Sequence, residues 1–178
     1  MSDTSQDLLT LAVQAKNEGR LADARNDASQ AVGLLRRRAP GVELAKALRL
    51  LGEVERKLHQ ELAARQHYEE AAELCRFYAD PLTVAHTVRH LGDLYQDVGQ
   101  PELAEPCFRE ALDLYRAQAD APPLDLANAI RSMAVLKGDL GATEEAKTLW
   151  EQARDLYAQV NVQEGVAESS ERLARLAG

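Results

Sequence analysis

Apolar positions along this chain follow the three- and four-residue spacing of amphipathic helices, and short breaks divide them into segments of similar length. The apolar stripe of the first segment comprises Leu8, Leu11, Ala12 and Ala15. Gly19 then marks its end, and a second helical pattern begins directly afterwards. The sequence therefore predicts two helices joined by a tight turn.

The same pattern returns four times, at intervals of 40, 40 and 42 residues. Each copy holds an alanine, a side chain that fills space four residues later, and a second alanine three residues after that. These positions are Ala24, Ala64, Ala104 and Ala146, then Ala28, Tyr68, Phe108 and Trp150, then Ala31, Ala71, Ala111 and Ala153. A long period built from small and large residues indicates an α-solenoid of helical hairpins, with the large residues in its core.

Breaks between the copies set the predicted boundaries. They lie at Pro40-Gly41, Asp80-Pro81, Ala121-Pro122-Pro123 and Asn161. We expect repeats over about residues 5–44, 45–84, 85–126 and 127–166, and a polar capping helix over about 164–177, in a single domain of residues 1–178. His59 takes the place that glycine holds in the turns of the other repeats, so that turn must form without glycine. Pro106 falls inside a helical pattern and predicts a kinked helix.

At these positions the chain resembles the tetratricopeptide repeat. Small residues stand at position 8 of that motif (Ala12, Gly52, Gly92 and Ala134), and alanine stands at positions 20 and 27 of every copy. The longer interval is similar to that of the subclass found in kinesin light chains and many bacterial regulators. The resemblance implies an all-α right-handed superhelix of four hairpins with a C-terminal capping helix. It also implies a protein–protein interaction scaffold that holds a peptide or helical segment of a partner in its concave groove.

Composition narrows the class of partner. A formal net charge of −8, from 29 acidic and 21 basic residues, disfavours nucleic acid and anionic membranes. No apolar run approaches the ~18 residues of a membrane span, and no signal-peptide pattern is visible, so we expect a cytoplasmic protein. Cys75 and Cys107 lie in apolar helical patterns and are expected to be reduced core residues. Without a phosphate loop, an activated nucleophile or a ligand cluster, the chain is not expected to be an enzyme or to hold a cofactor or metal.

The family's register places the first helix of each repeat along the groove and gives the candidate partner-binding residues. They are Lys46, Arg49, Glu53, His86, Arg89, His90, Asp93, Asn128 and Arg131. Arg49, Arg89 and Arg131 share one repeat position and form an arginine ladder. Because a guanidinium presents a planar fork to a carboxylate, the ladder predicts an acidic partner segment. The family's chaperone-binding carboxylate clamp is not expected, since Leu9 and Val13 stand where that clamp needs lysine and asparagine.

Other interpretations fit the same residues. Glu53 and Asp93 each follow an arginine of the ladder by four residues, and the alternative interpretation is that these are ordinary intrahelical ion pairs, worth ~0.2–0.5 kcal/mol each. His86 and His90 also stand four apart, near Asp93, a spacing that can hold a metal as well as form a polar pair. For the whole chain, the alternatives are self-association into a homodimer and a role as the regulatory subunit of an enzyme or a transcription regulator.

Overall fold

The computed structural model describes residues 4–177, and its regular structure there is entirely helical. The helices are α1 (Thr4–Asn17), α2 (Leu21–Leu35), α3 (Val42–Lys57), α4 (Glu61–Tyr78), α5 (Pro81–Asp97), α6 (Pro101–Ala117), α7 (Pro123–Asp139), α8 (Thr143–Gln159) and α9 (Gln163–Ala177). Residues 1–3 and 178 of the predicted domain lie outside the described residues.

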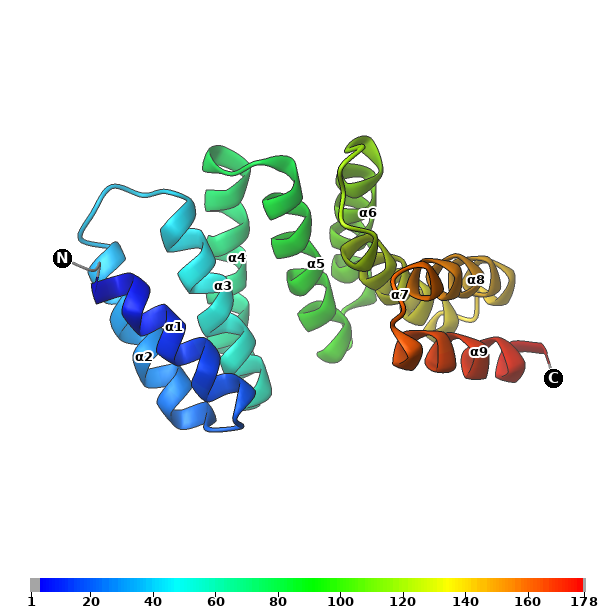
Figure 1. Ribbon diagram of the computed structural model, residues 1–178, viewed down its shortest axis with the longest axis horizontal. Helices are drawn as coiled ribbons and strands as arrows, with labels where there is room; N and C mark the ends of the chain where they lie inside the picture. Colours follow the sequence, from blue (N-terminus) through cyan, green and yellow to red (C-terminus); the bar gives the residue numbers. More distant parts are fainter. Residues whose placement is uncertain (1–3, 178) are drawn as a thin grey trace.

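The helices pack in sequence order. The first eight pair as hairpins, α1 with α2 through α7 with α8, and α9 packs on α8. Figure 1 shows the hairpins following one another along the long axis, with the two ends of the chain at opposite ends of the array. The predicted all-α solenoid of four hairpins and a closing helix is therefore confirmed.

The turn inside each hairpin depends on one residue in the left-handed backbone region. Gly19, Gly99 and Gly141 have φ angles of +77°, +70° and +75°, which glycine adopts without steric cost. His59 adopts +57° at the equivalent point of the second repeat, at a cost of roughly 1 kcal/mol for a residue with a Cβ. Asn161, at +59°, introduces α9 in the same way, and asparagine is enriched in this region.

Proline marks the starts of several helices. Pro81, Pro101 and Pro123 each occupy the first turn of a helix, where a missing N–H costs no hydrogen bond. The Asp80 side chain caps α5 by accepting a hydrogen bond from the Thr83 backbone N–H at 2.9 Å. The first helices of the later repeats begin three or four residues ahead of the predicted repeat boundaries, at Val42, Pro81 and Pro123.

Pro106 lies inside α6 without ending it. The helix continues from Pro101 to Ala117, since its apolar residues keep their helical spacing and pack on both neighbouring helices. The continuous helix is confirmed, while the kink stays a prediction.

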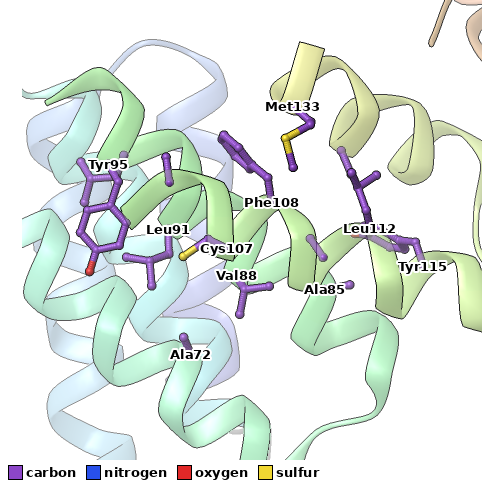
Figure 2. Packing of buried hydrophobic residues seen from close by; sticks show 14 of the residues in the cluster. Ala72, Ala85, Val88, Leu91, Tyr95, Cys107, Phe108, Leu112, Tyr115 and Met133 are labelled. Atoms are coloured by element: carbon purple, nitrogen blue, oxygen red, sulfur yellow. The ribbon is translucent and has the colours of Figure 1, made fainter. Parts of the chain in front are cut away.

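The core is made of the small and large residues that recur in each repeat, and Tyr68, Phe108 and Trp150 are all fully buried. A Cβ on Gly92 would lie 2.6 Å from the Phe108 ring, so only glycine lets α5 and α6 approach this closely. Figure 2 shows Met133 of the next repeat beside Phe108, and both belong to one buried cluster. Core side chains therefore join each repeat to the next.

Both cysteines are buried free thiols, as expected from their apolar surroundings. Burial raises the pKa of Cys107 to about 11. Among residues 4–177, none of the helices combines the length and the apolar character needed to cross a membrane.

Candidate binding groove

One face of the solenoid carries two pockets lined by the first helices of the repeats and by α9. We call this face the groove. Its N-terminal pocket, of about 250 Å³, lies between α1 and α3 and includes Lys46, Arg49 and Glu53. Its C-terminal pocket, of about 650 Å³, is lined by α3, α5, α7 and α9. The predicted residues that line this second pocket are Arg89, His90, Asp93, Asn128 and Arg131. His86 lines neither pocket.

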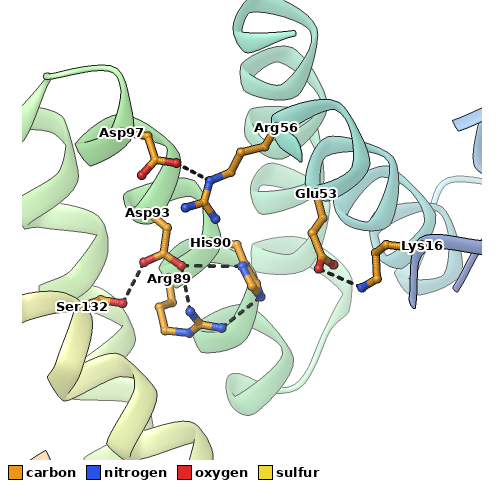
Figure 3. Close-up of polar contacts among 8 residues, drawn as sticks. All are labelled: Lys16, Glu53, Arg56, Arg89, His90, Asp93, Asp97 and Ser132. Atoms are coloured by element: carbon orange, nitrogen blue, oxygen red, sulfur yellow. Dashed lines mark hydrogen bonds and ion pairs between the residues drawn. The ribbon is translucent and has the colours of Figure 1, made fainter. Parts of the chain in front are cut away.

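Polar contacts between successive repeats occupy many of the acidic side chains of the groove. In each contact a long side chain of one first helix reaches an acidic residue of the next first helix. The contacts are Lys16–Glu53 at 2.8 Å, Arg56–Asp97 at 2.5 Å and Gln96–Asp139 at 2.9 Å, and Figure 3 shows the first two. Ion pairs at such partly exposed sites are worth roughly 1 kcal/mol or less each, so they set side-chain positions more than stability.

A buried polar cluster occupies the middle of the groove (Figure 3). Arg89, which is only 8% exposed, donates from Nη1 to Asp93 at 2.8 Å. Asp93 also accepts a hydrogen bond from the Ser132 hydroxyl of α7 at 2.7 Å. The Arg89 Nη2 lies 2.9 Å from His90 Nε2. Because a guanidinium can only donate, this histidine nitrogen must accept, and His90 is therefore neutral with its proton on Nδ1.

The electrostatics of His90 agree with that assignment. Burial, followed by the positive charge of Arg89, holds the pKa of His90 well below its ordinary value. The ring also stacks on Tyr68, with the centroids 6.2 Å apart. His90 is therefore a fixed, uncharged part of the groove wall.

Arg131 is held by the closing helix. Its Nε and Nη2 donate to the two carboxylate oxygens of Glu168 on α9, at 2.6 and 2.7 Å. This bidentate pair raises the pKa of the Arg131 guanidinium. Nearby, the Asn128 side-chain oxygen accepts a hydrogen bond from the Tyr157 hydroxyl at 2.8 Å. The last arginine of the ladder is thus already bound to a carboxylate of the same chain.

Arg49 is the member of the ladder that has no partner. It is half-buried, and it forms no hydrogen bond or ion pair with any residue in the described range 4–177. The expected intrahelical pair with Glu53 is wrong, because Glu53 turns to Lys16 of the preceding repeat. The corresponding pair of Arg89 with Asp93 is confirmed. Lys46 lies one turn earlier and pairs with Glu43 at 3.3 Å on the exposed surface.

His86 lies on α5 with its ring edge-on to His90, the centroids 4.8 Å apart. Burial lowers its pKa to about 3, and the positive charges of Arg49, Arg89 and Lys16 lower it further in that order of importance. No group of three or more histidine, cysteine or acidic side chains suited to a metal ion occurs within residues 4–177. Because the pKa of each ring is lowered well below its ordinary value, both histidines are uncharged at neutral pH.

Several groove residues were missing from the predicted set. They are Lys16, Arg56, Asp97, Ser132 and Glu168. The repeat register does direct Lys16, Arg56, Asp97 and Ser132 toward the groove, so a signal for them existed in the sequence. Their pairing with residues of the next repeat is not visible within any single helix.

This helical-repeat architecture agrees with the comparison with known protein families. Residues 43–117, which include all of α4, α5 and α6 and most of α3, match the family model described as "Tetratricopeptide repeat". Residues 43–117 are therefore a tetratricopeptide-repeat region, and the hairpins on either side of it continue the same helical-repeat fold. No curated protein matches the chain.

Solved structures share the fold over almost the whole chain. A Podosopora anserina kinesin light chain with nearly identical TPR-like repeats is 17% identical, covers 99% of this chain and 87% of its own, and gives a TM-score of 0.78. BtubC of P. vanneervenii is 16% identical over 97% of this chain and 79% of its own, with a TM-score of 0.73. The apo form of RapI is 11% identical over 95% of this chain and 62% of its own, with a TM-score of 0.85. Identities this low establish a shared fold and nothing further about function.

Proposed function

We propose that the chain is a non-catalytic scaffold whose groove binds a peptide or helical segment of a partner protein, and that the part of the segment beside α3 is acidic. Arg49 carries this proposal. Among residues 4–177 it is a half-buried cation without a partner, whereas Arg89 and Arg131 of the same ladder pair with acidic residues of the chain. An unpaired charge at a partly dehydrated site is unfavourable, so a carboxylate that reaches it gains a charge-assisted hydrogen bond.

The local balance of charge supports an acidic ligand at the N-terminal pocket. This pocket holds Lys16, Lys46 and Arg49 against two carboxylates, Glu43 and Glu53. The excess is positive in a chain of net charge −8. A small positive region on an acidic protein favours an acidic segment over a basic one.

Apolar side chains favour a polypeptide over a small ion. Leu9, Val13 and Leu50 line the same pocket as Arg49, and a second pocket continues the groove along α5 and α7. Side chains of a peptide can fill such alternating apolar and charged sites, and tetratricopeptide repeats generally serve as protein-interaction scaffolds.

Affinity capture from the native host's lysate tests the proposal. Arg49→Glu is the informative variant, because charge reversal at Arg89 or Arg131 would also break an internal ion pair and disturb the fold. Arg37→Glu is the matched control, since Arg37 is an exposed arginine beyond the end of α2.

We expect a partner that wild-type protein and the control recover and Arg49→Glu does not, with helix content unchanged by circular dichroism. Equal recovery by all three proteins would contradict an acidic segment in this groove.

Self-association is a second candidate, favoured by the exposed apolar side chains of α4. Phe77 is 84% exposed and Leu62 69% exposed, and large apolar groups in that state are typical of contact surfaces. Light scattering over a range of concentrations would detect a dimer, and the double variant Leu62→Gln, Phe77→Ser should dissociate it. A monomer at all concentrations would exclude this alternative.

A further inference from the structure

We infer that Arg49 and His86 form a site for one carboxylate side chain of the bound segment, and that filling this site draws a proton onto the imidazole. The inference rests on the proposed function, because it names the chemical group held at one place in the proposed groove. It also adds a property that a simple acidic groove would lack, which is coupling of binding to pH.

The internal repeat supplies the geometry. Arg131 and Glu168 lie 37 residues apart, at matching points of successive first helices, and their side chains meet at 2.6 Å. Arg49 and His86 have the same separation in the sequence and stand at the equivalent points of α3 and α5. In the C-terminal pair a carboxylate of the chain lies on the guanidinium. In the N-terminal pair a histidine replaces that glutamate, so the carboxylate is missing.

Both members of the N-terminal pair have unused hydrogen-bonding groups. Neither Arg49 nor the ring nitrogens of His86 have a hydrogen-bond partner among residues 4–177. Arg49 has five N–H donors, and a protonated imidazole adds two more. A carboxylate placed between them accepts from the guanidinium with one oxygen and from the imidazolium with the other. This reproduces the arrangement at Arg131, with the ligand supplying what Glu168 supplies there.

The charges around His86 explain why the site requires a ligand in order to bind a proton. The charged and titratable groups around this region are Lys16 of α1, Lys46, Arg49, Glu53 and Arg56 of α3, Tyr68 and Cys75 of α4, Arg89, His90 and Asp93 of α5, Tyr115 of α6 and Asp125 of α7. Glu53 is neutralised by Lys16 and Asp93 by Arg89, so the net local charge is positive. Burial and this charge keep the pKa of His86 near 3 in the free protein.

An incoming carboxylate reverses that balance. It neutralises Arg49 and offers an acceptor to the imidazole, and both effects favour the charged form of His86 and raise its pKa. By linkage, a ligand that raises a pKa binds more tightly as the pH falls toward the new value. If the bound-state pKa reaches about 6.5, affinity rises about tenfold between pH 7.5 and 5.5.

The probe for the experiment is an N-acetylated, C-amidated hexaglutamate peptide, and hexaglutamine is its uncharged counterpart. Calorimetry at pH 7.5 and 5.5 gives the affinities. The imidazole proton resonances of the four histidines, assigned with His86→Gln, give the pKa of His86 with and without peptide. We expect hexaglutamate to bind about tenfold more tightly at pH 5.5 and to raise the pKa of His86 by two units or more.

Three variants separate the roles. Arg49→Gln should lose at least tenfold in affinity at both pH values, and Arg49→Lys should retain part of it. His86→Gln should bind at pH 7.5 like wild type but lose the pH dependence. Arg37→Gln, the matched exposed control, should behave as wild type throughout.

The inference is overturned if hexaglutamate does not bind, if the His86 resonances keep their titration when it does, or if free glutarate at the same carboxylate concentration gives the same response. These results are distinct from failure of the proposed function. If capture of a lysate partner depends on Arg49 but the titration of His86 does not change on binding, only the proposed Arg49–His86 carboxylate site is contradicted. If capture of the partner is the same with Arg49→Glu as with wild type, the proposal that the groove binds an acidic segment is contradicted.

Discussion

Arg49 and Arg131 occupy the same position in two repeats, yet Arg49 is unpaired within the described part of the chain and Arg131 is held by two hydrogen bonds from its guanidinium to Glu168. The helices around them are alike, and so is their place in the groove. The difference lies in a single residue 37 positions later, which is a histidine in one case and a glutamate in the other. The residue supplied by the next repeat thus determines whether the arginine at this repeat position forms an internal ion pair or is left as a candidate binding site.

The largest effect should come from removing the support of the Arg131 pair. A Cβ on Gly165 of α9 would lie 2.4 Å from the buried Tyr157 ring, so Gly165→Val forces α9 away from α8 and separates Glu168 from Arg131. We expect a loss of about 2 kcal/mol in the free energy of unfolding, measured by urea denaturation. Gly138→Ala is the control, because a Cβ there meets nothing within 4 Å, and it should gain about 0.5 kcal/mol. Similar destabilisation by both substitutions would show that α9 is not sensitive to this contact.

Exchanging the residue types of the two pairs is the most direct test of the comparison. His86→Glu places a carboxylate where Arg49 can bind it, and should lower hexaglutamate affinity by about tenfold, or about 1.4 kcal/mol, as measured by calorimetry. Glu168→Gln frees Arg131 and should raise that affinity while lowering the free energy of unfolding by roughly 1 kcal/mol. Unchanged binding in both variants would mean that these arginines do not reach the ligand.

His86 should also make the free energy of unfolding depend on pH. The folded-state pKa of His86 lies below its unfolded value of about 6.5, so the unfolded chain binds more protons and stability falls as the pH drops below 6.5. Allowing for its partial exposure, we expect His86 to account for about 1 kcal/mol of the loss between pH 7 and 5. Urea denaturation at both pH values should show a smaller loss for His86→Gln than for wild type, and equal losses would contradict this cause.

The smallest expected effect concerns ion pairs between the second helices of successive repeats. There Arg36 pairs with Glu70 and Arg76 with Glu110, at matching points of successive second helices. At the next junction Arg116 holds the position of Arg36 and Arg76, but Gln152 stands at the position of Glu70 and Glu110. Gln152→Glu should therefore raise the free energy of unfolding by about 0.3 kcal/mol, and 0.5 M salt should abolish the gain. A gain that survives salt would point to a cause other than this ion pair.

The fold was predictable because its signals are local or strictly periodic. Glycine at the turns, proline in first turns and alanine at the helix contacts all act through the backbone or through excluded volume, and both effects depend on residue type alone. Even the turn at His59, with φ at +57°, was predictable, because the period fixes where a turn must occur whatever residue stands there.

The state of the site was less predictable. The Arg89–Asp93 pair followed from four-residue spacing, because one helix holds both residues. Glu53 had two cations within reach, Arg49 on its own helix and Lys16 on the preceding one, and only the packing of α1 on α3 decides between them. The Arg131–Glu168 pair depends in the same way on how α9 is seated. Contacts between repeats require the angle between helices, which residue spacing does not contain.

Arg49 is a local positive site on a chain of net charge −8, and this affects the rates at which an acidic segment associates and dissociates. As it comes within about one Debye length of the surface, about 8 Å at physiological ionic strength, an acidic segment is repelled by the net negative charge of the molecule. Only after close approach does it encounter Arg49. Added salt should therefore speed association by screening the repulsion, while it also speeds dissociation by weakening the contact. Encounter and retention would then depend on ionic strength in opposite ways, and lifetime more than arrival rate would select the partner.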